Sequence, residues 1–278
     1  MLFIMLTETW LRDHVDAELS IPNYSIFRSD RTRPKKKRGH DSGGAAIYIR
    51  DDMAASAEIL LKYSNGVVEL VCVHIKSQNL VLCTIYRQPN DIKGRNISTS
   101  KEFNQPLQKL TEVLDRLPVP TPDIILSGDF NLPKTSWPEG IPKSGATRDE
   151  KEMLTLLSNI TSQHFLSQYI MEPTHQAGNT LDLIFTNNPA IIHSCQTTPT
   201  QPVSPHYVVH CTTPMSSNIH KQEACKETAA SEFAEINLFS EDTDWDQIEN
   251  MLCKYEWEHE FEGLTVEEMT KKIYKHIF

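Results

Sequence analysis

The tetrapeptide Gly128-Asp129-Phe130-Asn131 places a carboxylate and an amide two residues apart. It follows the apolar run 124–127, which predicts a short buried strand bounded by Pro122 and Pro133. Side chains at i and i+2 point the same way in extended backbone. A carboxylate can hold a metal ion or activate water, and an amide can donate to a phosphate oxygen, which suits phosphodiester hydrolysis. An Asp and an Asn that only form turn hydrogen bonds fit the tetrapeptide equally well.

Further polar residues stand where other apolar segments begin or end, namely Glu8, Tyr86, Asp182 and His206. Each has a structural alternative: Glu8 as a surface carboxylate, Tyr86 as a core residue with a satisfied hydroxyl, and His206 as a structural histidine. Asp182 is harder to explain in that way, because a carboxylate inside an apolar strand is costly to bury unless it is paired. Functional residues concentrate on such strand-end loops.

The elements that must position these residues are strands mixed with a few helices. Apolar and alternating runs predict strands at 2–6, 45–50, 67–76, 79–86, 124–127, 180–186 and 207–212. Helical spacing predicts helices over 103–117, which Pro118 ends, and over 149–163. Hairpin-like spacing favours antiparallel pairing, so we expect a mostly antiparallel α+β fold or a layered α/β sandwich.

Composition is that of an ordinary globular protein, with 278 residues, 39% hydrophobic and 23% charged. The six cysteines form no CxxC pair and no Cys/His spacing suited to zinc. No apolar run approaches the roughly 20 residues of a membrane span, and no secretion signal stands out. We therefore expect a reduced, intracellular protein with no membrane partner.

The net charge of -10 is unevenly distributed along the chain. Residues 221–278 carry 6 Lys and 15 acidic residues, whereas residues 1–220 are nearly neutral. The overall acidity therefore does not argue against a nucleic-acid partner for the first part. We predict a catalytic-type domain over 1–213 and an acidic, partly helical segment over 214–278.

One dense basic run interrupts the first part of the chain. Its cations are Arg31, Arg33, Lys35, Lys36, Lys37 and Arg38. A solvated loop between strands, a nuclear import signal and a phosphate-contacting loop all fit such a run. We favour the import signal over the DNA contact, and expect a nuclear protein.

Six motifs occur in a characteristic order: 8–11 (ETWL), 43–50 (GGAAIYIR), 86–89 (YRQP), 127–131 (SGDFN), 180–186 (TLDLIFT) and 204–206 (SPH). This order resembles the endonuclease domain of non-LTR (LINE-type) retrotransposons of the jockey and chicken-repeat kind. These domains belong to the endonuclease/exonuclease/phosphatase superfamily. The resemblance covers residues 2–213, and the tail resembles the linker that precedes the reverse transcriptase in such elements.

The resemblance implies a four-layer α/β sandwich, in which helices flank two sheets. It implies metal-assisted attack of water on a DNA phosphodiester, leaving a 3′-hydroxyl that primes reverse transcription. The implied partners are DNA and a reverse transcriptase in cis. A carboxylate-rich site suits Mg²⁺, or Mn²⁺ in its place.

The resemblance also implies a role for each site residue. Glu8 would bind the metal, and Asp129 would orient or deprotonate the attacking water. Asn131 would donate to a phosphate oxygen, and Tyr86 would stabilise developing charge.

Two further positions, Asp182 and His206, complete the implied site. Asp182 would assist at the leaving group or the metal, and His206 would contact the phosphate as a general base or an electrostatic clamp. Thr180 and Ser204 would supply supporting hydroxyls.

The chain departs from the family pattern in two places. Ser204-Pro205-His206 stands where the family has Ser-Asp-His, so the acid expected to orient the histidine is missing, and no acid lies within 203–210. The chain also opens on the strand that ends in Glu8, without the family's first strand, which carries an Asn, and the helix after it. We therefore expect a fold lacking that first strand and helix, and reduced or absent activity.

Two other functions compete with the endonuclease. A decayed or domesticated protein could bind nucleic acid or a partner without cutting, which the two departures favour. Another superfamily phosphodiesterase could act on a lipid headgroup, although the motifs at 43–50 and 86–89 argue against it. Salt-dependent DNA binding without cleavage distinguishes the first alternative, and lipid turnover the second.

Overall fold

The computed structural model describes residues 1–11, 16–31, 43–89, 99–200 and 204–213. The chain divides into two units, residues 1–217 and 218–278. The predicted acidic segment 214–278 lies outside the described residues. None of the helices described is long and apolar enough to cross a membrane.

The larger sheet has six strands in the order β10-β11-β7-β6-β5-β4. The strands are β4 (Ala57–Ser64), β5 (Val68–Ile75), β6 (Leu80–Arg87), β7 (Asp123–Asp129), β10 (Ser167–Gln168) and β11 (Asp182–Thr186). Neighbours pair antiparallel except β6 and β7, which are parallel. A parallel pair needs a crossover connection, and a helix between β6 and β7 supplies it.

The smaller sheet has three antiparallel strands, with β3 between β1 and β2. The strands are β1 (Phe3–Thr7), β2 (Tyr24–Ser29) and β3 (Ala45–Arg50). A separate hairpin pairs β12 (Ser194–Thr198) with β13 (Val208–Thr212), and a short one pairs β8 (Thr135–Ser136) with β9 (Ile141–Pro142).

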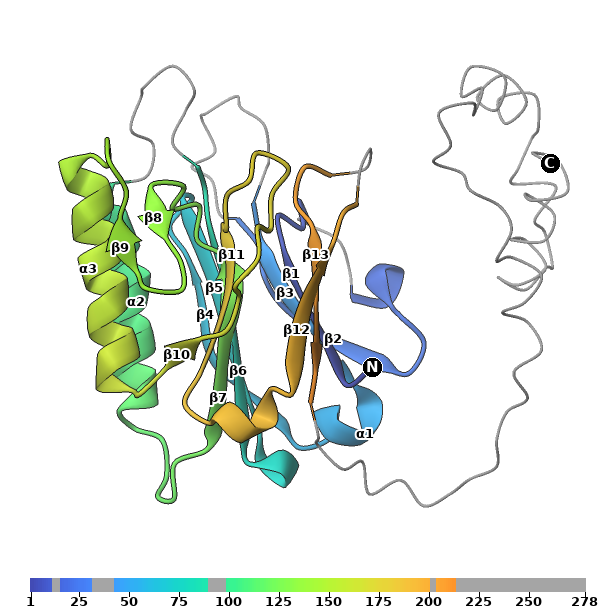
Figure 1. Cartoon of the computed structure of the whole chain (residues 1–278). Coiled ribbons are helices and arrows are strands. Elements are labelled where there is room, and N and C mark those ends of the chain that lie inside the picture. The colour runs from blue at the N-terminus through green and yellow to red at the C-terminus, as the bar shows by residue number, and fades with distance from the viewer. Residues whose placement is uncertain (12–15, 32–42, 90–98, 201–203, 214–278) are drawn as a thin grey trace, which may run out of the picture. The chain divides into compact units, whose positions relative to one another are not determined.

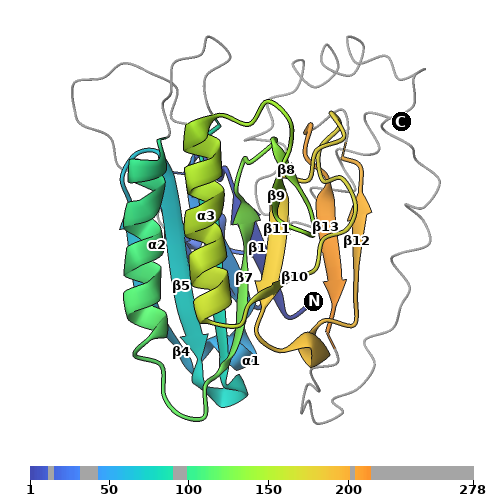
Figure 2. The ribbon, with the colours of Figure 1, turned by 60° about the vertical axis from the view of Figure 1, so that its left-hand side comes forward.

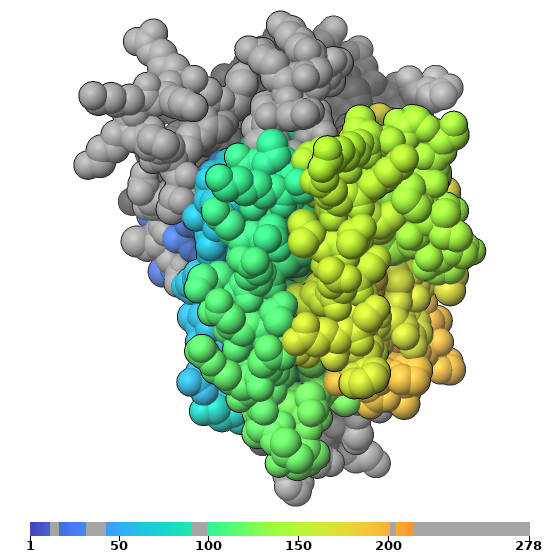
Figure 3. Space-filling model, turned by 90° about the vertical axis from the view of Figure 1, so that its left-hand side faces the viewer, coloured from blue at the N-terminus to red at the C-terminus, as the bar shows by residue number. Residues whose placement is uncertain are grey.

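Two helices cover the outer face of the larger sheet (Figures 1 and 2). They are α2 (Ser100–Leu114) and α3 (Arg148–Gln163), and they lie side by side on the surface in Figure 3. Each begins with a capping box, formed by Thr99 with Glu102 and by Thr147 with Glu150, which satisfies backbone donors at the helix start. The remaining helical segments are short: α1 (Asp51–Ala54), η1 (Asp16–Leu19), η2 (Lys76–Gln78) and η3 (Pro189–Ile191).

Two hydrophobic layers hold the sandwich together, and β5 contributes to both. Its residues Val68, Leu70 and Cys72 pack toward α2 and α3, whereas Val71, Val73 and Ile75 pack toward the smaller sheet. Alternation of side chains along a buried strand explains this division. The order is therefore helices, larger sheet, smaller sheet, with α1 beside β2 and β3. This confirms the layered α/β sandwich.

The predicted strands and helices are present, with ends shifted by a few residues. Strands β2, β4 and β12, and the two-residue strands β8, β9 and β10, are not among the predicted strands. β2 and β4 lie at sheet edges and are only partly buried, so their sequences carry little apolar patterning. Pairing among the described strands is mostly antiparallel, as expected, and β6 with β7 is the parallel exception.

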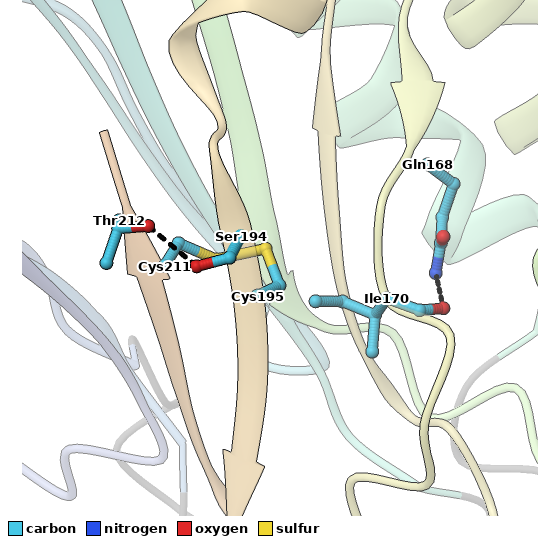
Figure 4. Close-up of a disulfide and its surroundings, with 6 residues drawn as sticks. All are labelled: Gln168, Ile170, Ser194, Cys195, Cys211 and Thr212. Carbon is cyan, nitrogen blue, oxygen red and sulfur yellow. Dashed lines mark hydrogen bonds between the residues drawn. A yellow bond between two sulfur atoms is a disulfide. The ribbon is translucent and has the colours of Figure 1, made fainter. Parts of the chain in front are cut away.

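The cysteines differ from the reduced state that we expected. A disulfide joins Cys195 on β12 to Cys211 on β13, which are directly opposite in the register (Figure 4). Sequence spacing gave no sign of this pair because the two residues meet only when the hairpin forms. Cys72 and Cys83 are free and buried.

Candidate active site

Four polar residues form a row across the larger sheet. Glu69 on β5 is opposite Tyr86 on β6, Tyr86 is beside Asp129 on β7, and Asp129 is opposite Asp182 on β11. Residues paired in this way present their side chains on the same face of a sheet. Ser127, two residues before Asp129, donates to Met5 Sδ on β1. The row therefore faces the smaller sheet.

Gly128 lets β6 and β7 approach closely beside this row. A Cβ at this position would clash with the carbonyl oxygen of Ile85, and its φ of 145° is one that other residues rarely adopt. The next turn is also unusual, because Asn131 has a φ of 49°. Non-glycine residues in the left-handed region are strained and cluster at functional sites.

Asp129 is buried and tightly held by Asn131. The backbone N–H of Asn131 donates to Asp129 Oδ1 at 3.0 Å, and its side-chain amide donates to Oδ2 at 2.6 Å and to the carbonyl of Arg87 at 2.8 Å. Asn131 therefore orients Asp129 here, whereas we expected it to donate to a phosphate. Burial raises the pKa of Asp129, the charge of Asp182 raises it further, and His206 and the Asn131 N–H oppose this.

Arg87 supports the same turn from below and was not predicted. Its Nε donates to the carbonyl of Phe130 at 2.7 Å, and its Nη2 donates to the carbonyl of Asn131. The residue is 1% exposed, and burial lowers its pKa to about 10 despite the acidic groups around it. It fixes the backbone that carries Asp129 and Asn131.

His206 is paired with an acid, contrary to the sequence expectation. Its Nδ1 lies 2.9 Å from Asp182 Oδ2, and its Nε2 lies 3.9 Å from Asp129 Oδ2. The absence of an acid at Pro205 therefore does not leave the ring without an orienting partner, because β11 brings one from 24 residues upstream. Burial lowers the pKa of His206, but the hydrogen bond and charge of Asp182, with Asp129 and Glu8, outweigh it and raise the pKa to about 9.

Thr174 connects the start of β11, which carries Asp182, with the loop that carries His206. Its buried hydroxyl accepts from the backbone N–H groups of Leu181, at 2.9 Å, and Asp182, at 3.0 Å. Its carbonyl accepts from the N–H of Tyr207 at 2.7 Å. Sequence reasoning missed Thr174 because nothing in a lone threonine signals two long-range contacts.

The two predicted supporting hydroxyls have different surroundings. Ser204 Oγ accepts from the backbone N–H of His206 at 3.1 Å, so it shapes the turn that presents the histidine. Thr180 Oγ1 donates to the carbonyl of Glu172 at 3.2 Å, in an exposed position. His175, which was not predicted, packs its ring against His206 with centroids 4.9 Å apart.

Glu8 reaches the site from the end of β1. Its side chain accepts from the hydroxyl of Tyr86, and its own φ is 53°. Burial raises the pKa of Tyr86 far above its usual value, and the hydrogen bond and charge of Glu8 raise it further. The phenol therefore stays protonated. The charge of Glu8 also contributes to raising the pKa of both Asp129 and His206. Glu8 therefore lies within electrostatic reach of the acidic row.

Asp129, Asp182 and His206 form the group in the described residues that could hold a metal ion. One ligand atom from each lies within 4.8 Å of the others. Two carboxylates whose mutual repulsion raises the pKa of Asp129 would be stabilised by a cation between them. The donor set, mostly oxygen, fits a hard divalent ion. Glu8, the predicted metal ligand, is not one of these three residues.

Arg31 does not belong to an accessible basic run. It is buried and forms an ion pair with Glu69, with Nη2 and Oε2 2.9 Å apart. Arg31 is therefore unavailable to an import receptor or to DNA, contrary to the sequence expectation. The other five cations of the run, Arg33, Lys35, Lys36, Lys37 and Arg38, lie outside the described residues.

Several solved structures resemble this one. The endonuclease domain of TRAS1, a telomere-specific non-LTR retrotransposon, is 14% identical and aligns over 68% of this chain and 77% of its own, with a TM-score of 0.43. An AP endonuclease from Leishmania major is 14% identical and aligns over 75% of this chain and 77% of its own, with a TM-score of 0.49. An AP endonuclease from Archaeoglobus fulgidus is 14% identical and aligns over 76% of this chain and 88% of its own, with a TM-score of 0.46. No curated protein sequence matches the chain.

A family model described as endonuclease-reverse transcriptase matches residues 80–210. The matched segment contains five of the clustered residues, Tyr86, Asp129, Asn131, Asp182 and His206. The same segment supplies the central strands β6, β7 and β11 that align them. Over residues 80–210, which carry most of the site, the chain is therefore similar to the endonuclease-reverse transcriptase family.

Proposed function

We propose that this protein is a divalent-metal-dependent DNA endonuclease of the non-LTR retrotransposon type. It would hydrolyse a phosphodiester and leave a 3′-hydroxyl that a reverse transcriptase in cis extends. The cluster of Asp129, Asp182 and His206, inside the segment that matches an endonuclease-reverse transcriptase family, carries this proposal.

The residues divide the chemistry by their protonation. In the metal-free protein the pKa of His206 is raised to about 9, which favours a role as an electrostatic clamp on a phosphate oxygen over a role as the base. The raised pKa of Asp129 makes this carboxylate the better proton acceptor from an attacking water. Tyr86 remains protonated and can donate to developing negative charge.

Asp182, with Glu8 nearby, would hold Mg²⁺ or Mn²⁺ beside Asp129. The bound ion would neutralise charge on the scissile phosphate and the leaving oxygen. Asn131 and Arg87 keep the Asp129 carboxylate in place. Asp182 keeps His206 oriented although Pro205 supplies no acid, which supports an active site.

A plasmid-nicking assay tests the proposal. Supercoiled DNA should become open circular with Mg²⁺ or Mn²⁺ and stay intact with EDTA. Asp129→Asn should abolish nicking, whereas Asp115→Asn, at the exposed end of α2, should not. A DNA polymerase should extend the nick without prior phosphatase treatment, because the product carries a 3′-hydroxyl.

Other outcomes would identify other functions. Salt-dependent DNA binding without nicking in either metal would favour a non-catalytic nucleic-acid-binding protein. Turnover of a phosphoinositide faster than DNA would favour a lipid phosphodiesterase. Nicking that survives Asp129→Asn would contradict the assignment of the site.

A further inference from the structure

We propose that the buried ion pair between Arg31 and Glu69 is a positioning element for Glu8 and Tyr86. The two sheets contribute these site residues separately, Glu8 after β1 and Tyr86 from β6. The inference rests on the proposed function, and it assigns a role to two buried residues outside the cluster of Asp129, Asp182 and His206.

Glu69 completes the polar row, but at the end away from Asp182. It is 0% exposed and lies directly opposite Tyr86 in the sheet. Its Oε1 accepts from Arg31 Nε at 3.0 Å and from Ser64 Oγ at 3.2 Å. Its Oε2 accepts from Arg31 Nη2 at 2.9 Å and from the N–H of Gly44 at 3.2 Å. Both oxygens of this buried carboxylate are therefore satisfied.

Arg31 links Glu69 to the ring of Tyr86. Its bidentate contact with Glu69 and its Nη1 bond to Gln88 Oε1, at 2.6 Å, hold the guanidinium in one plane. Its Cζ lies 5.5 Å from the centroid of the Tyr86 ring, within cation–π range. The ring is thus held from one side by Arg31, and its hydroxyl by Glu8.

Gly43 and Gly44 link the ion pair to the loop that carries Glu8. A Cβ on Gly43 would clash with the Arg31 guanidinium, and one on Gly44 would clash with Thr9 Oγ1. The carbonyl of Gly43 accepts from the N–H of Trp10 at 2.8 Å. The two glycines are therefore packed between the ion pair and the loop that carries Glu8.

That loop needs an external constraint. Glu8 has a φ of 53° and Trp10 a φ of 55°, which are strained values for non-glycine residues. Such conformations persist only when their surroundings impose them. The contacts run from Glu69 through Gly44 and Gly43 to Trp10, and so supply that constraint.

A purely structural role makes a different prediction, which the test uses. Replacing a buried ion pair with apolar residues of similar size is often neutral for stability, whereas removing one partner is costly. The double variant Arg31→Met/Glu69→Leu therefore removes the pair without stranding a charge. Arg50→Met/Asp52→Leu is the matched control, because it removes a bidentate pair outside the site.

The first readout does not need activity. The protein has eight tyrosines, and 3-fluorotyrosine labelling with a Tyr86→Phe variant assigns the Tyr86 resonance by ¹⁹F NMR. In Arg31→Met/Glu69→Leu, this resonance should shift and broaden more than the other seven, with the control unchanged. An unchanged Tyr86 resonance in a folded double variant would overturn the proposal. If the double variant does not fold, Glu69→Gln, which keeps the shape of the side chain, takes its place with the same criterion.

The second readout is plasmid nicking. We expect the double variant to lose about 10- to 100-fold in kcat with KM for DNA unchanged, because misplaced groups cost rate and not binding. Arg31→Lys keeps the charge but loses the bidentate contact with Glu69, so its kcat should lie between those of the wild-type protein and the double variant. Full kcat in the double variant would contradict the positioning role. If the wild-type protein does not nick DNA, the proposed function fails and the NMR result still decides this inference.

Discussion

His206 is the residue whose chemistry depends most on its neighbours. A histidine after a proline, in a segment without acids, carries no sign of its partner in the sequence. The fold supplies Asp182 at 2.9 Å and Asp129 at 3.9 Å. Two carboxylates at these distances make the imidazolium the favoured form, so the residue suits phosphate contact better than proton abstraction.

The first prediction concerns the protonation of His206 in the metal-free protein. Its imidazole should titrate near pH 9 by NMR, and Asp182→Asn should bring the midpoint down toward its ordinary value near 6.5. Because the pKa is raised on folding, the stability that this group contributes is fully present below about pH 6.5 and is lost as pH rises through about 9. A midpoint at or below 6.5 in the wild-type protein would contradict the pairing.

The second prediction concerns Gly128. Gly128→Ala should destabilise the protein by at least about 2–3 kcal/mol, because the new Cβ meets the Ile85 carbonyl oxygen as well as an unfavourable φ. Gly145→Ala is the matched control, since Gly145 has a φ of 81° but no atom within 4 Å of its added Cβ. It should cost only about 1–2 kcal/mol. Equal losses in the free energy of unfolding, measured by chemical denaturation, would show that backbone strain alone explains the need for glycine at position 128.

At the level of elements, sequence patterning predicted the buried central strands and the two amphipathic helices. The strand that ends in Asp129 and the helices α2 and α3 were predicted to within a few residues. Register could not be predicted, and register is what aligns Tyr86, Asp129 and Asp182. Glu69 had the same signature as Asp182, a carboxylate inside an apolar strand, and that signal could have found it.

The third prediction concerns Thr174, which joins the loops before β11 and β13. Thr174→Val keeps the shape but leaves the N–H groups of Leu181 and Asp182 without their buried acceptor. We expect a loss of about 1–3 kcal/mol in the free energy of unfolding and a lower His206 pKa, because Asp182 moves. Thr180→Val should change neither, since its exposed hydroxyl contacts only the Glu172 carbonyl. A wild-type His206 titration in Thr174→Val would show that Thr174 does not position Asp182.

At the scale of the whole folded unit, the site is held together by parts that are remote in the chain. Asp129 and Asp182 come from neighbouring strands of the larger sheet, and His206 from the loop before β13. Glu8 and Arg31 come from the ends of strands in the smaller sheet. The acidic cluster therefore exists only when the sandwich is folded, and an ion that binds there binds only the native state.

This dependence gives the fourth prediction, on metal ions and thermal stability. Mn²⁺ or Mg²⁺ should raise the melting temperature in proportion to the logarithm of the ion concentration. At one hundred times the Kd, the ion should add about 2.7 kcal/mol to the free energy of unfolding. Asp182→Asn should abolish the increase, because it removes one of the two carboxylates whose repulsion the ion relieves. Glu112→Gln, exposed on α2, should leave the increase intact. An increase of equal size in Asp182→Asn would place the ion elsewhere, and no increase in the wild-type protein would mean that the cluster does not bind it.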